Sequence, residues 1–71
     1  MSRFGDAAFA YMRARGANEI SSDALWEGLE SERPDLTVKT ATRKTPRTTC
    51  MRDLRKDARF NVGQGRIALK E

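Results

Sequence analysis

Near the end of the sequence, apolar and polar residues alternate on both sides of a glycine-containing turn. Phe60 and Val62 precede Gly63-Gln64-Gly65, and Ile67 and Leu69 follow it. Alternation with a period of two around such a turn predicts a β-hairpin over residues 60–69, with its apolar side chains on one face. Because an isolated hairpin is only marginally stable in water, it must pack on another part of the chain. The fold must therefore combine this hairpin with helices.

The sequence offers neither an internal disulfide bond nor the usual kind of zinc site to stabilise so small a fold. Its 71 residues suffice for one domain, residues 1–71, and include a single cysteine, Cys50, and no histidine. An internal disulfide and a zinc site of the usual cysteine and histidine type are therefore excluded. With 38 % hydrophobic and 34 % charged residues, the composition favours a small packed core over disorder. We expect a modest net stability.

Two helices are predicted in the first half of the chain. Apolar residues at helical spacing indicate the first over residues 3–15, ending at Gly16. Its predicted buried residues are Phe4, Ala7, Ala8, Tyr11 and Met12. The second begins after Ser21 as its N-cap and is stopped by Pro34 near Ser31. Its predicted buried side consists of Ala24, Leu25, Leu29 and Trp26. Just before it, a short strand at Ile20 could pair with the hairpin.

A loop over residues 35–44, with a short extended piece at Leu36 and Val38, leads to a third helix over residues 46–58. Thr45 is a good N-cap, and Pro46 suits the first helical position because its missing N–H would have no partner there. The predicted apolar face consists of Cys50, Met51, Leu54 and Ala58. The predicted polar face consists of Thr48, Arg52, Arg55 and Arg59, with Thr49 and Lys56 at its margins.

Charge is divided unevenly along the chain. Residues 1–38 contain four Lys or Arg against seven Asp or Glu, a net charge of −3. Residues 39–71 contain ten against three, a net charge of +7. Such an asymmetry predicts a localised positive surface that attracts a polyanion.

Three helices followed by a two-stranded hairpin form the element order of an α+β winged helix-turn-helix domain. The competing fold is a three-helix bundle with a disordered basic tail. The regular alternation around Gly63-Gln64-Gly65 argues against that bundle, because a disordered tail has no need of it.

The chain also resembles the HARE-HTH winged-helix family, which includes the N-terminal domain of the RNA polymerase delta subunit. The matching features are Thr45-Pro46, Leu54, Arg59-Phe60, Gly63-x-Gly65 and Leu69. The first helix and Ile20 also fit, so the resemblance extends loosely over nearly the whole chain, while residues 33–44 depart from it. It implies a DNA-associated or polymerase-associated role and does not choose between them.

In a helix-turn-helix domain the third helix enters the major groove of duplex DNA, where the fork of an Arg side chain matches the O6/N7 edge of guanine. Thr48, Arg52 and Arg55 are therefore the candidate base readers. The candidate phosphate contacts are Thr45, Arg47, Lys56 and Arg59, extended by Lys39, Arg43 and Lys44 in the preceding loop. Thr49, at the margin of the same face, is a further candidate DNA-binding residue. Gln64 and Arg66 form a wing tip that could follow the backbone or probe the minor groove.

The simpler alternative is a solvated face in which Asp53 and Asp57 neutralise the basic residues of the third helix. Only two acids interrupt six basic residues between Arg47 and Arg66, which favours nucleic acid. No catalytic, cofactor or metal site is expected, because the chain lacks histidine, a phosphate-binding glycine loop and paired carboxylates.

We therefore predict a DNA-binding transcriptional regulator that is not an enzyme, of the small kind encoded by phages or mobile elements. It would act in the cytoplasm on the nucleoid, as a homodimer or as several copies on DNA. One alternative is an interaction domain that docks on RNA polymerase or another nucleic-acid machine through the acidic face of the second helix. Another is a nonspecific DNA-coating protein. No membrane role is expected, because no apolar run approaches ~20 residues and no signal peptide is recognisable.

Overall fold

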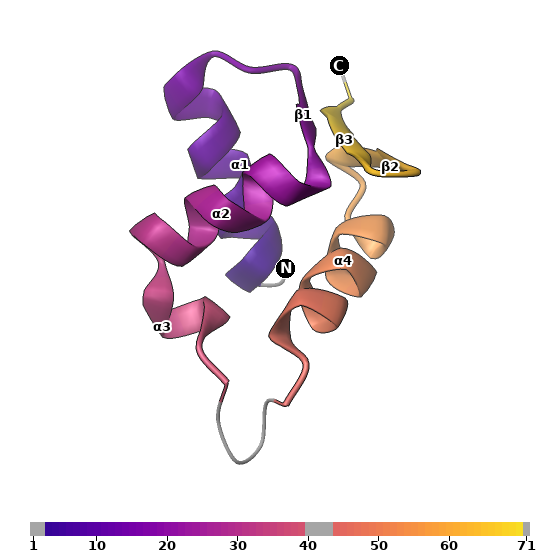
Figure 1. Ribbon diagram of the computed structural model, residues 1–71. Coiled ribbons are helices and arrows are strands. Elements are labelled where there is room, and N and C mark those ends of the chain that lie inside the picture. Colours follow the sequence, from indigo (N-terminus) through magenta and orange to yellow (C-terminus); the bar gives the residue numbers. More distant parts are fainter. Residues whose placement is uncertain (1–2, 40–43, 71) are drawn as a thin grey trace.

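The computed structural model describes residues 3–39 and 44–70. Its elements follow one another along the chain as shown in Figure 1. They are α1 (Arg3–Arg15), β1 (Glu19–Ser21), α2 (Ser22–Glu32), α3 (Pro34–Thr37), α4 (Pro46–Lys56), β2 (Phe60–Gly63) and β3 (Arg66–Leu69). The α+β class is confirmed, but the described residues form four helices where the sequence predicted three.

The first two helices form largely as expected. The bounds of α1 match the prediction, and the chain leaves it through Gly16 at φ 65°, a conformation that favours glycine. Ser21 caps α2, because its hydroxyl accepts a hydrogen bond of 3.1 Å from the amide of Ala24. The helix continues to Glu32, slightly beyond the predicted end near Ser31. Leu25, Trp26 and Leu29 are buried as predicted, but Ala24 is exposed.

The segment predicted as a loop over residues 35–44 starts instead as the short helix α3. Pro34 occupies its first turn, so this proline begins a helix as well as following one. Leu36 is buried in α3 and not in an extended piece, whereas Val38 is extended and 53 % exposed. The burial of Leu36 in the core explains why the chain turns here.

Helix α4 is shorter than predicted. It ends at Lys56, and Asp57 after it has extended backbone angles. Ala58 therefore does not lie on the apolar face of the helix, and it is exposed. Cys50 and Leu54 are fully buried, and Met51 is half-buried against the core.

The three strands form one antiparallel sheet in the order β1-β3-β2. The predicted hairpin is confirmed, with Phe60 opposite Leu69, and so is the strand at Ile20, which pairs with Ile67. Gly65 takes φ 70° in the hairpin turn. Its carbonyl accepts a 2.9 Å hydrogen bond from the amide of Ser22, which ties the turn to the start of α2.

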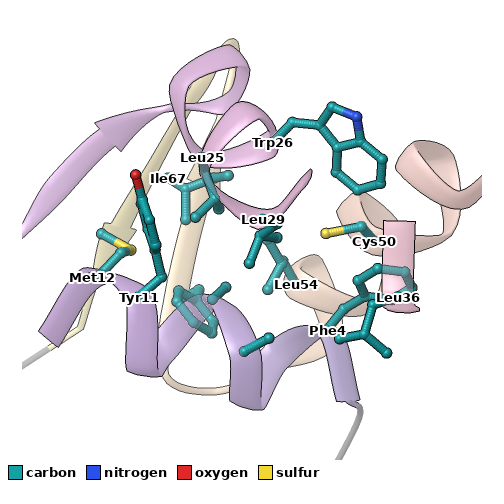
Figure 2. Packing of buried hydrophobic residues seen from close by; sticks show 13 residues of the cluster. Phe4, Tyr11, Met12, Leu25, Trp26, Leu29, Leu36, Cys50, Leu54 and Ile67 are labelled. Atoms are coloured by element: carbon teal, nitrogen blue, oxygen red, sulfur yellow. The ribbon is translucent and has the colours of Figure 1, made fainter. Parts of the chain in front are cut away.

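The core lies between the helices and one face of the sheet (Figure 2). Met12 from α1, Leu25 and Leu29 from α2, Leu54 from α4 and Ile67 from β3 are each at most 1 % exposed. Every long helix and the central strand thus contribute to one cluster, which fixes the orientation of α4. Within the described parts of the chain, none of the helices has the length and apolar character needed to cross a membrane.

Candidate nucleic-acid interface

The polar face of α4 points away from the core. Thr48, Arg52 and Arg55 are exposed, while Cys50 and Leu54 are buried. At 3.6 residues per turn, the first three lie on one face of the helix, opposite the two buried residues. We call Thr48, Arg52 and Arg55 the α4 stripe. The packing of α4 therefore presents the predicted base readers together on the surface.

The cations on and beside this stripe have no ion-pair partner among the acids that the structure describes. Arg52, Arg55 and Lys56 form no ion pair within the described segments, although other arginines of the chain do. Asp57, one of the two acids that the solvated-face alternative expects to neutralise the basic residues, does pair with one of them, Arg59. It makes no ion pair with Arg52, Arg55 or Lys56. The charge of the stripe is therefore available to an external anion.

Arg59 does not belong to this surface, contrary to the sequence prediction. The helix ends before it, so Arg59 lies in the link between α4 and β2. Its guanidinium pairs with Asp57 at 2.7 Å and with Asp6 of α1 at 3.0 Å, and it lies 5.0 Å from the centre of the Phe9 ring. The side chain is only 24 % exposed. Arg59 therefore ties α4, β2 and α1 together and offers little to a ligand.

The electrostatics of this link agree with its geometry. Hydrogen bonding to the Arg59 guanidinium lowers the pKa of Asp57 below its usual value. The same hydrogen bond, with a second that the guanidinium donates to Asp6, raises the pKa of Arg59. Both groups therefore stay charged throughout the neutral pH range.

The N-terminal end of α4 borders a hollow of about 370 Å³. The hollow is lined by Trp26, Glu30, Thr37, Lys39, Lys44, Thr45, Pro46, Arg47 and Thr48. Lys39, Lys44, Thr45 and Arg47 were predicted phosphate contacts, and the structure brings them together here. Thr48 lies both in the hollow and on the α4 stripe, so the two surfaces are continuous. Arg43, also predicted, lies outside the described residues.

The threonines at this end of α4 do not all act as expected. Thr45 occupies the N-cap position, but its side chain makes no capping hydrogen bond. Thr49 is half-buried, and its hydroxyl donates to the carbonyl of Thr45 at 3.3 Å. Arg47 is paired with Asp23 of α2, which offsets part of its charge. Thr49 and Arg47 are therefore less available to a ligand than Lys39 and Lys44, which are exposed.

The predicted wing tip is exposed at the hairpin turn. Gln64 lies in the turn and Arg66 begins β3. The guanidinium of Arg66 lies 3.3 Å from the carboxylate of Glu19 across the sheet, and both side chains are more than half exposed. An ion pair so open to water contributes little and can exchange with another anion. Figure 1 shows the hairpin beyond the C-terminal end of α4, so the two basic elements are neighbours.

Trp26 was predicted only as a core residue. It is 8 % exposed, in agreement with that prediction, but its remaining surface lines the hollow. No sequence signal reveals this second role, because the hollow forms between α2 and residues of later elements, from Thr37 to Thr48. The contact depends on tertiary packing alone.

Cys50 has none of the properties of a catalytic nucleophile. Burial raises the pKa of its thiol to about 12, and the carboxylate of Asp53 adds to the effect. The thiol is therefore neutral at physiological pH. Across residues 3–39 and 44–70, no group of three or more acids, cysteines or histidines is placed to hold a metal ion.

Comparisons with known proteins gave no match: no family model matches the sequence, and no curated protein or solved structure is significantly similar to it. The resemblance to the HARE-HTH family stays a prediction. The functional interpretation rests on the residues and their arrangement.

Proposed function

We propose that this protein is a small winged-helix regulator of transcription that binds duplex DNA without catalysing a reaction. In this proposal α2 and α4 form the helix-turn-helix, α4 enters the major groove, and the β2-β3 hairpin is the wing. The sheet order supports it, because pairing of β1 with β3 holds the hairpin beside the helices. The resemblance to the HARE-HTH family is consistent with the same architecture.

The observation that carries the proposal is the α4 stripe. Arg52 and Arg55 are exposed opposite the buried face of α4 and form no ion pair with a described acid. A helix of this width fits the major groove, and an arginine there can donate two hydrogen bonds to guanine. Two neighbouring unpaired arginines repel each other in the free protein, and an anionic ligand would relieve this repulsion.

Around the stripe, further cations would contact the DNA backbone. Lys56 lies at one margin of the stripe, and Lys39 and Lys44 lie near its N-terminal end. Gln64 and Arg66 would place the hairpin on the backbone or at the minor groove. A single module of this size offers a small interface, so we expect a homodimer or several copies on DNA, acting in the cytoplasm on the nucleoid.

The experiment is a selection of bound duplexes from a random pool, followed by binding measurements on the selected site. If Arg52 and Arg55 read bases, R52A or R55A should each weaken binding to that site by about 1–3 kcal/mol and relax its specificity. K70A is the matched control, because Lys70 is exposed and lies outside the proposed interface. A selection that yields no preferred sequence would indicate nonspecific coating, and unchanged affinity in R52A and R55A would refute the role of the stripe.

The exposed acids of α2 favour a second candidate, docking on RNA polymerase or another nucleic-acid machine. Glu27 and Glu30 are exposed and form no ion pair in the described part of the chain. Reversing both to Lys should abolish capture of a protein partner while leaving duplex affinity intact or stronger. Unchanged capture would count against this candidate.

A further inference from the structure

The start of α4 lacks the side-chain cap that the start of α2 has. In α2 the hydroxyl of Ser21 accepts from the Ala24 amide. In α4 the side chain of Thr45 caps nothing, and the amides of Arg47 and Thr48 have no partner in the described segments. Free amides and the positive end of the helix dipole favour an anion at this position.

Trp26 supplies a second, independent donor at the same place. Its side chain is 8 % exposed and lines the hollow, yet its indole N–H donates no hydrogen bond to a described residue. Figure 2 shows the nitrogen on the side of the ring that faces away from Cys50 and Phe4. No side-chain nitrogen or oxygen of the described residues is buried without a partner, so the N–H atom itself reaches solvent although most of the ring is buried. A tryptophan N–H that no protein group accepts can donate to an acceptor from outside the protein.

The charges around the hollow specify the kind of acceptor. Lys39, Lys44 and Arg47 line it, against one acid, Glu30. Part of the Arg47 charge is offset by Asp23. Lys39 and Lys44 form no ion pair with any acid in residues 3–39 and 44–70. The hydroxyls of Thr45 and Thr48 add further donors at the rim. Ammonium groups, hydroxyls, amides and an indole N–H together match a compact oxyanion with several acceptor oxygens.

We propose that this hollow binds a phosphate group, with the Trp26 N–H and the first amides of α4 as fixed donors and Lys39 and Lys44 as counter-charges. The hollow adjoins the α4 stripe through Thr48. If the protein binds duplex DNA as proposed above, a backbone phosphate of the duplex would therefore occupy the hollow, and in this respect the phosphate site rests on the proposed function. The fixed donors would then set how far α4 enters the groove. A free phosphate-bearing small molecule offers the same chemistry, and the experiment separates the two sources.

The single tryptophan makes the test direct, because the ¹H–¹⁵N spectrum contains one indole N–H resonance. Inorganic phosphate is titrated into the whole chain at constant ionic strength set with sodium chloride. The expected result is a saturable shift of the Trp26 indole resonance. A shift that chloride alone reproduces, or none at all, would overturn the proposal.

Variants locate the effect within the hollow. Lys39→Gln and Lys44→Gln should each weaken phosphate binding by about fivefold, a change typical of losing one exposed charge from a site. Glu30→Gln should strengthen it, and Lys70→Gln, outside the hollow, should leave it unchanged. These residues are exposed, so the variants should fold. Equal weakening by Lys70→Gln would reduce the effect to overall charge and refute a site.

A second titration, with a DNA duplex, shows whether the phosphate belongs to the DNA backbone or to a small molecule. It also tests the phosphate site separately from the proposed DNA-binding function. A short DNA duplex is added while its own binding is followed by fluorescence anisotropy of an attached dye. If the duplex binds, shifts the indole resonance and is displaced from the hollow by inorganic phosphate, the ligand is a backbone phosphate. If the duplex does not bind while phosphate still shifts the resonance, the DNA-binding function fails and the phosphate site stands as a small-molecule site. If the duplex binds with no change at Trp26, the function stands and a backbone phosphate in the hollow is refuted.

Discussion

Gly28 shows how one residue controls the packing of two helices. It is buried in α2, and a Cβ at this position would overlap the aromatic ring of Tyr11 on α1. The Cβ would lie 2.2 Å from Cζ of Tyr11, a residue that is itself only 8 % exposed, so the buried ring would have to shift. Glycine in the middle of a helix costs about 1 kcal/mol relative to alanine, so its presence here reflects the close approach of α1 and α2.

We therefore expect Gly28→Ala to lower the free energy of unfolding by about 1–3 kcal/mol, since overpacking outweighs the gain in helix propensity. Urea unfolding followed by circular dichroism would measure this. Gly63→Ala is the control, because a Cβ at Gly63 meets nothing within 4 Å, and it should change stability by no more than about 0.5 kcal/mol. A Gly28→Ala variant as stable as the wild type would mean that the two helices can move apart freely.

At this scale the sequence predicted burial well and specific contacts poorly. Tyr11 and Trp26 were correctly predicted as core residues, because the spacing of apolar residues reports which face is buried. The restraint on Gly28 and the position of Trp26 beside the hollow were not predicted. Both arise where one element meets another, and the spacing of residues within a helix carries no information about the neighbouring helix.

Between elements, the Arg59 link joins the C-terminal end of α4 to the sheet and to α1. Asp57 is the better buried partner, with a side chain 9 % exposed, and it accepts hydrogen bonds from both the backbone amide and the guanidinium of Arg59. Because these bonds favour the carboxylate, the pKa of Asp57 is lower in the folded chain than in the unfolded chain.

The link should therefore add a pH-dependent part to stability. A depressed carboxyl pKa stabilises the fold above the unfolded value, near pH 4 for aspartate, and this contribution is lost as the pH falls through the lower, folded value. Asp57→Asn should be less stable than the wild type at pH 7, and the difference should shrink as the pH falls below about 4. Urea unfolding at a series of pH values measures it.

Glu19→Gln provides the comparison for this experiment. Glu19 pairs with Arg66, but both side chains are more than half exposed, and open pairs of this kind contribute little. This variant should follow the wild-type stability at every pH. A difference between Asp57→Asn and wild type that does not depend on pH would show that the Arg59 link stabilises through packing alone.

The sequence predicted most elements, and the exceptions have identifiable causes. The helix over residues 3–15, the Ser21 cap and the hairpin with its third strand are confirmed, because each has a local signature. Helix α3 is too short for a repeating apolar pattern to form. Just after the early end of α4, Arg59 pairs with both Asp57 and the distant Asp6, and no local pattern reports the second contact.

Over the whole molecule, folding gathers the excess positive charge of the second half onto one continuous surface. The hollow and the α4 stripe share Thr48, and Lys56 extends the stripe toward the hairpin. The uneven charge of the two halves predicted such a surface. It could not predict that pairing with acids of the first half would withdraw Arg59 and partly withdraw Arg47 and Arg66. The sequence alone therefore overestimates the number of available cations.

This reduced set of cations leads to a prediction for the salt dependence of DNA binding. Each phosphate contact contributes about −0.9 to the slope of log Kobs against log salt concentration, through release of counterions. Lys56→Ala should reduce the magnitude of the slope by about 1 and weaken binding to all duplexes alike. Arg59→Lys keeps the charge but loses the two-pronged pairing with Asp57, so it should change stability and leave the slope unchanged. Fluorescence anisotropy titrations between about 50 and 200 mM salt would measure both slopes. A slope that falls by about 1 in an Arg59→Ala variant that remains folded would return Arg59 to the DNA-binding surface and contradict the structural role argued for it.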